Sequence, residues 1–134
     1  MAKRPSAGTR SFGVDRGERL KARHVAEGKP INMRTVELDY DLPAISVWGY
    51  RHEETVLTDT KLDLTCTFCP FAQVWDELGA NDIGWMYDYE FHVAQYQAYL
   101  PGMIVEFDGV KTLGSNTCKF RFRMPEDVEV EPSR

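Results

Sequence analysis

The chain has 134 residues, of which 43% are hydrophobic, 12% aromatic and 28% charged, so it can bury one compact core and has little room for a second. No apolar run approaches the roughly 18 residues of a membrane-spanning helix, and the basic N-terminal residues lack the apolar stretch of a secretory signal. We therefore expect no membrane partner. Three cysteines cannot all pair within one chain, and with no secretory signal we expect free thiols in a cytoplasmic protein.

The net charge of -5 is unevenly distributed along the chain. Residues 1–34 carry nine Lys/Arg against three Asp/Glu, whereas residues 35–134 carry seven against eighteen. An acidic body repels a phosphate backbone, so we do not expect nucleic acid as a partner. We interpret residues 1–33 as a basic flexible leader with a short helix over 14–27, residues 34–125 as a single domain and residues 126–134 as an acidic tail.

Alternating apolar and polar residues predict strands in the first part of the domain. In residues 34–41 every second residue is apolar, namely Val36, Leu38 and Tyr40. We predict a second strand over 44–51 and a third extended segment over 57–68.

The period changes at Pro70, a residue that is favoured in the first turn of a helix. Apolar residues then follow at helical spacing, namely Phe71, Val74, Trp75 and Leu78. A second helix is predicted from about residue 83 to residue 100, with Asn81 or Asp82 as its N-cap. A strand over 103–107 and a turn at 114–116 follow it.

The last predicted strand has the clearest pattern. Its apolar side carries Cys118, Phe120, Phe122 and Met124, and its basic side carries Lys119, Arg121 and Arg123. Strands, then two helices, then a hairpin indicate an α+β domain with a mostly antiparallel sheet and two helices packed on one face.

Cys69 is the strongest candidate for a nucleophile. It stands immediately before Pro70, where the positive end of a helix dipole and unpaired N–H groups favour the thiolate. A buried thiol at a strand–helix corner is the alternative, and position alone does not separate the two. Cys66 and Cys69 also form a C-x-x-C pair, but no second pair of ligands lies at the short spacing of a zinc site. We predict no cofactor, and metal binding by these two thiols stays open as an alternative.

Asp88 and His92 lie four residues apart on the second helix and therefore share a face. A carboxylate beside an imidazole could orient a general base that activates the thiol. Trp85, Tyr89 and Tyr96 lie near the same stripe and could wall a substrate pocket, although packing against the sheet explains them equally well. We interpret Cys118 as a core residue that matters to the site only if the fold brings it beside Cys69. His24 lies in the basic leader and carries no prediction.

Residues from about Leu62 to Met124 resemble the L-2-amino-thiazoline-4-carboxylic acid hydrolase family. Three pieces carry the resemblance: Cys69-Pro70 with a following Glu77-Leu78-Gly79, the acidic and aromatic helix from Asp88, and Gly114 followed by Cys118-x-Phe120-x-Phe122. A similar Gly…Cys-x-Phe ending occurs in 4-vinyl reductase-like and TRAPP-like domains, which suggests that topology.

The resemblance implies a divergent, cysteine-dependent hydrolase that opens a C–N or C=N bond of a small cyclic or amide-like substrate. It places the reacting groups around Cys69, the acidic helix and the terminal hairpin. We therefore predict Cys69, His92 and Asp88 as catalytic residues and Trp85, Tyr89, Tyr96 and Cys118 as substrate-binding residues. Two alternatives remain open: a non-catalytic module that binds a small ligand or a metal, and an accessory subunit whose basic leader binds an acidic partner. A homodimer that buries part of the aromatic helix is a further expectation.

Overall fold

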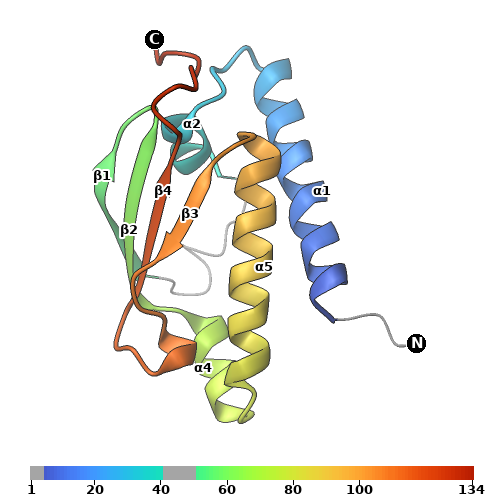
Figure 1. Ribbon diagram of the computed structural model, residues 1–134, viewed down its shortest axis with the longest axis vertical. Helices are drawn as coiled ribbons and strands as arrows, with labels where there is room; N and C mark the ends of the chain where they lie inside the picture. The colour runs from blue at the N-terminus through green and yellow to red at the C-terminus, as the bar shows by residue number, and fades with distance from the viewer. Residues whose placement is uncertain (1–4, 41–50) are drawn as a thin grey trace.

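The computed structural model describes residues 5–40 and 51–134, which form a four-stranded sheet with helices layered on one side (Figure 1). The strands are β1 (Arg51–Leu57), β2 (Lys61–Phe68), β3 (Ile104–Phe107) and β4 (Cys118–Arg123), and their order in the sheet is β1-β2-β4-β3. All three strand pairings are antiparallel. The α+β class and the antiparallel sheet that the sequence predicts are confirmed.

Strand β4 shows most directly how sequence pattern determines the two faces of the sheet. Cys118, Phe120 and Phe122 are buried, and the basic residues between them are exposed. On the exposed face Arg121 pairs with Asp108 at 2.8 Å and Arg123 pairs with Glu106 at 2.7 Å. The apolar face supplies the core, so the helices must lie on that side.

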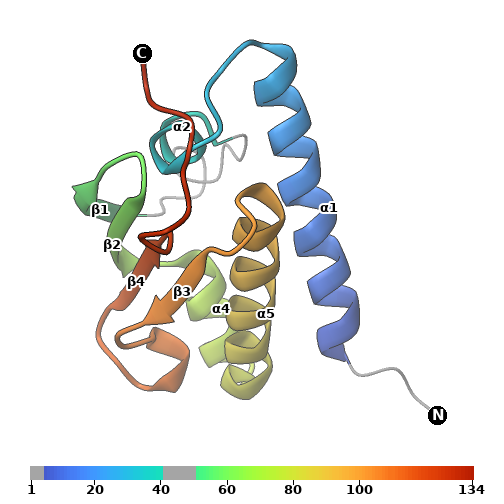
Figure 2. The same cartoon turned by 45° about the horizontal axis from the view of Figure 1, so that its top comes forward.

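Two helices follow β2, as predicted. The first is α4 (Pro70–Glu77), and the second is α5 (Asn81–Tyr99), whose buried side packs on the sheet (Figure 2). The Tyr96 ring lies 4.3 Å from that of Phe122, between centroids. Helix α5 begins without a side-chain cap from Asn81 or Asp82, and Ala80 occupies the N-cap position.

Residues that the sequence placed in a flexible leader form the long helix α1 (Pro5–Ala26), which makes a third layer against α5 (Figure 2). The two helices approach closely because Gly13 and Gly17 face α5. A Cβ on Gly13 would lie 2.7 Å from the Phe91 carbonyl oxygen, and one on Gly17 would overlap that of Gln95. The packing of α1 thus depends on the absence of side chains at two glycines one turn apart.

The predicted strand over 34–41 is wrong, because residues 33–38 form the short helix α2 (Met33–Leu38). The Asn32 side chain caps it by accepting a hydrogen bond from the Thr35 amide at 2.9 Å. Met33 and Val36 are buried at helical spacing, whereas Leu38 is 70% exposed. The second predicted strand, over 44–51, falls almost entirely outside the described residues; only Arg51 belongs to a strand, as the first residue of β1.

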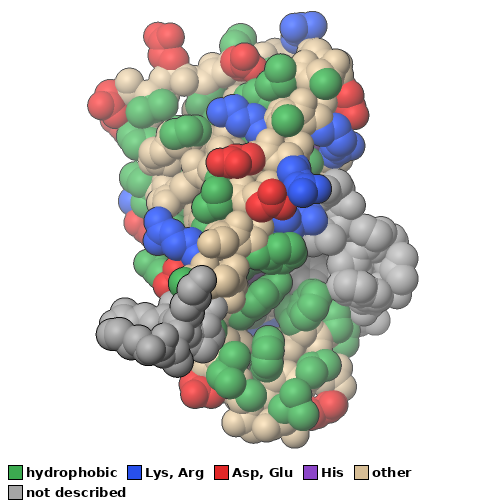
Figure 3. All heavy atoms as spheres, turned by 90° about the vertical axis from the view of Figure 1, so that its right-hand side faces the viewer, with side chains coloured by type: hydrophobic (Ala, Val, Ile, Leu, Met, Phe, Trp, Pro, Cys, Tyr) green, Lys and Arg blue, Asp and Glu red, His purple; other side chains and the backbone are tan. Residues whose placement is uncertain are grey.

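Outside the core, charged side chains are unevenly distributed over one face of the molecule (Figure 3). Charged side chains of both signs lie among hydrophobic ones in the upper part of this view (Figure 3). On α1, Arg19 and Asp15 form an ion pair at 2.9 Å. Hydrophobic side chains gather in the lower part (Figure 3). No helix in residues 5–40 or 51–134 combines the length and the apolar character needed to cross a membrane.

Candidate functional site

Cys69 occupies the N-cap position of α4, directly after β2 ends at Phe68. Its backbone is extended (φ -131°, ψ 113°), and Pro70 begins the helix. The pKa of the half-buried Cys69 thiol falls to about 6, chiefly through a hydrogen bond from Cys66. The first amide groups of α4, those of Phe71 and Ala72, and the charge of Lys111 lower the pKa further, against the opposing effect of burial. Cys69 is therefore largely a thiolate at neutral pH.

The fold brings all three cysteines to one end of the sheet. Cys66 and Cys118 are opposite each other in the register of β2 and β4, and both are buried. The Cys118 sulfur accepts a hydrogen bond from the Lys111 amide at 3.2 Å, and burial raises the pKa of its thiol to about 11. Cys118 is thus a core thiol that stays protonated at neutral pH, and it is not among the described residues that line the pocket at Cys69.

Asp88 reaches this site from α5. Burial raises the pKa of its carboxyl to about 7, and the charge on Cys69 adds to the rise. The Asp88 charge in turn contributes to the raised pKa of Cys118. The Asp88 carboxyl, which can still hold a proton at neutral pH, and the Cys69 sulfur therefore influence each other electrostatically, although Asp88 is not among the described residues that line the pocket at Cys69.

His92 does not pair with the Asp88 carboxylate. Its Nδ1–H donates to the backbone carbonyl oxygen of Asp88 at 2.6 Å, and its ring stacks on Phe120 at 5.1 Å. Burial lowers the pKa of the imidazole, so the ring is neutral at pH 7. The four-residue spacing placed the two residues on one face as expected, but the hydrogen bond goes to the main chain.

An open pocket of about 330 Å³ lies at Cys69. Its walls come from the end of β2, from α4 and from the loop between β3 and β4. The lining residues are Phe68, Cys69, Ala72, Gln73, Asp76, Lys111, Gly114, Ser115 and Asn116. The loop bends over α4 after a short 3-10 helix (Lys111–Leu113) that ends at Gly114, whose φ of 98° favours glycine.

The aromatic residues predicted to bind substrate are not among the described residues that line this pocket. Trp85 packs on Tyr89 and Phe107, with ring centroids 5.6 and 5.2 Å away. Tyr96 is buried in the core against Phe122. Trp85 and Tyr96 thus pack against the sheet, which was the alternative to a role in the pocket. Tyr89 is 44% exposed, so packing explains it only in part.

The sequence reasoning missed the polar wall of the pocket. Ser115 and Asn116 belong to the predicted turn at 114–116, and Lys111 precedes that turn. A signal was present, because a lysine and a Gly-Ser-Asn turn directly precede the Cys-x-Phe strand to which the family resemblance points. Residues of a turn in that position can line a binding pocket as well as reverse the direction of the chain.

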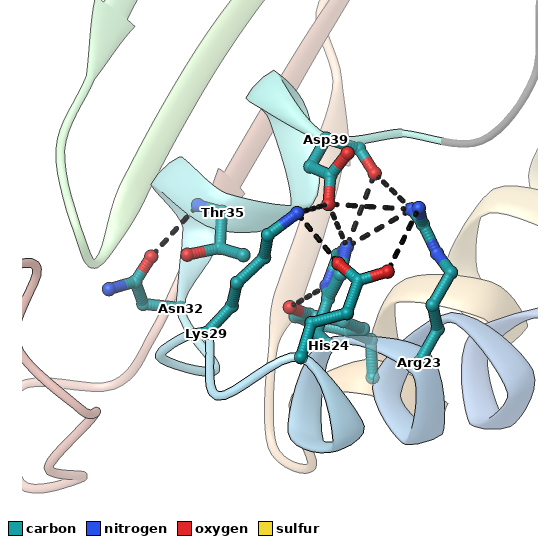
Figure 4. Close-up of polar contacts among 8 residues, drawn as sticks. Arg23, His24, Lys29, Asn32, Thr35 and Asp39 are labelled. Carbon is teal, nitrogen blue, oxygen red and sulfur yellow. Dashed lines mark hydrogen bonds and ion pairs between the residues drawn. The ribbon is translucent and has the colours of Figure 1, made fainter.

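A second polar cluster, also missed, joins α1, α5 and the end of α2 (Figure 4). The His24 side chain is fully buried, its Nδ1 lies 2.7 Å from the Tyr99 hydroxyl, and its Nε2 lies 3.1 Å from an Asp39 carboxylate oxygen. Lys29 and Arg23 pair with the same carboxylate, and the Lys29 hydrogen bond is the main cause that lowers the pKa of Asp39. Because His24 and Tyr99 are both sealed from solvent, this cluster is structural and holds three elements together.

Comparison with known proteins finds no matching family model, no matching curated protein and no matching solved structure. Among the residues that the structure describes, no group of three or more His, Cys, Asp or Glu side chains is arranged to hold a metal ion. The chemistry of the site must therefore be argued from its own geometry.

Alkylation by iodoacetamide is expected to distinguish Cys69 from the other two thiols. We expect one thiol of the native protein to react, with a half-maximal rate near pH 6, because the thiolate is the reacting form and the pKa of Cys69 is about 6. Cys66 and Cys118 are expected to react only after unfolding, since both are buried. Mass spectrometry of the native protein across the pH range measures both quantities. A midpoint close to the ordinary thiol value of about 8.5 would contradict the assignment.

Proposed function

We propose that this protein is a hydrolase that opens a C–N or C=N bond of a small cyclic or amide-like substrate, with Cys69 as nucleophile. The observation that carries the proposal is the electrostatic coupling between an ionised sulfur in an open pocket and the half-buried Asp88 carboxyl, whose pKa is raised to about 7. The resemblance to the thiazoline hydrolase family points to the same class of reaction. The pocket volume of about 330 Å³ suits a compound of one small ring.

In the proposed mechanism the Cys69 thiolate attacks the electrophilic carbon of the C–N or C=N bond. The Asp88 carboxyl donates its proton to the nitrogen, so that a C–N single bond can break without expelling a free amide anion. A C=N bond becomes a C–N single bond in this step and breaks after its nitrogen takes a second proton from water. A covalent thioester-like adduct on Cys69 remains. The Asp88 carboxylate then takes a proton from water, whose oxygen attacks the adduct and releases the thiolate. Asp88 thus takes the acid–base role that the sequence had assigned to His92.

Lys111 and the amide groups at the start of α4 are the groups that stabilise negative charge in this scheme. Lys111 lines the pocket, and its charge already lowers the pKa of Cys69. The same charges favour the oxygen or nitrogen anion that forms when the thiolate attacks. Because the nucleophile must stay reduced, we propose that the protein works in a reducing compartment such as the cytoplasm.

The direct test uses 2-amino-2-thiazoline-4-carboxylate, together with simpler cyclic amidines and lactams, as substrates. The wild-type protein is expected to add one water molecule to at least one of them, which mass spectrometry of the products detects. Cys69→Ala should abolish this reaction. Cys118→Ala is the matched control, because it removes a neighbouring thiol that stays protonated and should keep the activity. Equal loss in both variants, or equal turnover in the wild type and Cys69→Ala, would refute the nucleophile.

A further inference from the structure

The C-x-x-C pair places two thiols of different accessibility in contact. Cys66 lies near the end of β2 and is fully buried, whereas Cys69 lines the open pocket at the start of α4. The Cys66 thiol donates a hydrogen bond to the Phe68 carbonyl oxygen at 3.2 Å, and its interaction with the Cys69 sulfur is the main cause that lowers the pKa of Cys69. In the proposed hydrolysis Cys66 helps to keep Cys69 ionised, but the Cys66 thiol itself does not react.

We propose that Cys69 is a site of reversible oxidation by hydroperoxides, and that Cys66 closes the oxidised sulfur into a Cys66–Cys69 disulfide. A small peroxide reaches Cys69 through the pocket, and the contact with Cys66 supplies the second thiol at the correct place. This site needs no substrate of the hydrolase and is independent of whether hydrolysis occurs.

The chemistry balances with the peroxide as the oxidant. The Cys69 thiolate attacks one peroxide oxygen, an S–O bond forms, the O–O bond breaks, and hydroxide leaves. The Cys66 thiol then attacks the sulfenic sulfur of Cys69, an S–S bond forms, the S–O bond breaks, and water leaves with the Cys66 proton. Two thiols are oxidised by two electrons in total, and one peroxide is reduced to two waters once the hydroxide is protonated.

Cys118 is the competing partner, and its contacts argue against it. Its sulfur is engaged by the Lys111 amide at 3.2 Å, on the side of the β3–β4 loop. The raised pKa of its thiol also makes it a poor attacking group in exchange. The Cys66 sulfur, by contrast, already contacts Cys69.

Closure of the disulfide removes the nucleophile of the proposed hydrolase. It also protects Cys69 from further oxidation to sulfinic acid, which is not reversed by thiols. The oxidised protein is expected to lose alkylation at Cys69 completely, and dithiothreitol is expected to restore it.

The experiment treats the full-length reduced protein with a small excess of hydrogen peroxide and then counts thiols and maps disulfides. We expect the loss of two thiols per chain and of the mass of two hydrogen atoms, both reversed by dithiothreitol. Trypsin separates the alternatives, since no Lys or Arg lies between Lys61 and Lys111, and Cys118 falls in the next peptide, residues 112–119. A Cys66–Cys69 disulfide stays within the peptide 62–111, whereas a bond to Cys118 joins the two peptides.

Two variants complete the test. In Cys66→Ala, peroxide should oxidise Cys69 to the sulfinic acid without forming a disulfide, and dithiothreitol should not restore this product. Cys118→Ala is the matched control and should form the disulfide as the wild type does. Joined peptides, three intact thiols after peroxide, or a wild-type Cys69 that is oxidised only to the sulfinic acid would each overturn the proposal. The wild-type peptide map is decisive even if a variant fails to fold, and none of these readings depends on turnover.

Discussion

Replacement of Asp88 by asparagine is expected to slow the proposed hydrolysis by about 10²- to 10⁴-fold, the usual range for loss of a general acid–base group. Asparagine keeps the size of the side chain but cannot hand a proton to the leaving nitrogen. The thiolate of Cys69 should survive, because the Asp88 carboxylate repels it and the charge of Cys69 is itself a cause of the raised pKa of Asp88. The rate of iodoacetamide alkylation at pH 7 is therefore expected to match or exceed that of the wild type.

The pH dependence of stability gives the structural control for this variant. The pKa of Asp88 rises from 3.8 to about 7 on folding, so the folded protein holds this proton more tightly than the unfolded chain does. Its contribution to stability is full below the unfolded value and is lost as the pH rises through about 7. The asparagine side chain of Asp88→Asn does not ionise. The free energy of unfolding of this variant should therefore fall less than that of the wild type between pH 3.8 and about 7, which urea titrations at several pH values can measure.

A second variant separates the two candidates for the proton carrier. His92→Phe keeps a ring to stack on Phe120 and removes both imidazole nitrogens. It is expected to retain most of the turnover, because the His92 hydrogen bond goes to the Asp88 main-chain carbonyl and not to its carboxylate. If His92→Phe is as slow as Asp88→Asn, then the imidazole moves the proton and our assignment of the carboxyl is wrong.

Gly17→Ala is expected to destabilise the fold by about 1–3 kcal/mol, the usual cost of overpacking a close contact. The new methyl group would overlap the Gln95 carbonyl oxygen and lie 2.9 Å from the Ala98 Cβ, so α1 must move away from α5. The backbone of α5 cannot yield easily, because Tyr96 beside it is packed on Phe122. This cost outweighs the gain of about 1 kcal/mol that alanine brings over glycine inside a helix.

Gly8→Ala is the matched control in the same helix. A Cβ at Gly8 meets nothing within 4 Å, so only the helix propensity changes. This variant is expected to raise stability by about 0.5–1 kcal/mol, and the two substitutions should therefore shift the unfolding midpoint in opposite directions. Denaturant unfolding followed by circular dichroism measures both. Equal stabilisation by the two alanines would mean that α1 does not pack on α5 in solution.

The parts of the fold that could be predicted are those in which local pattern and burial agree. Strand β4 alternates perfectly, and Pro70 marks the start of α4 by its own backbone restriction. The strand predicted over residues 34–41 is wrong because three apolar residues at every second position also satisfy part of a helical turn once Asn32 provides a cap. The length of α1 was missed because Gly13 and Gly17 form part of its buried side, and a hydrophobic pattern does not detect glycines.

The candidate site was predicted in part. The position of Cys69 before a helix is a local property, so the sequence alone could suggest an activated thiol. The proximity of Asp88 to Cys69 is a property of tertiary packing, and spacing along α5 paired Asp88 with His92 instead. The sequence alone could not place Lys111 in the pocket wall. The position of this loop residue depends on the register of β3 with β4, which only the structure gives.

The two sides of the pocket differ in how strongly the fold constrains their sequence. Cys69 and α4 are tied to the core strand β2, whereas Lys111, Ser115 and Asn116 sit on a surface connection between two neighbouring strands. Surface connections accept insertions and replacements at small cost to the framework. Substitutions in the β3–β4 loop could therefore change the substrate specificity of related proteins, while Cys69 and Asp88 stay in place.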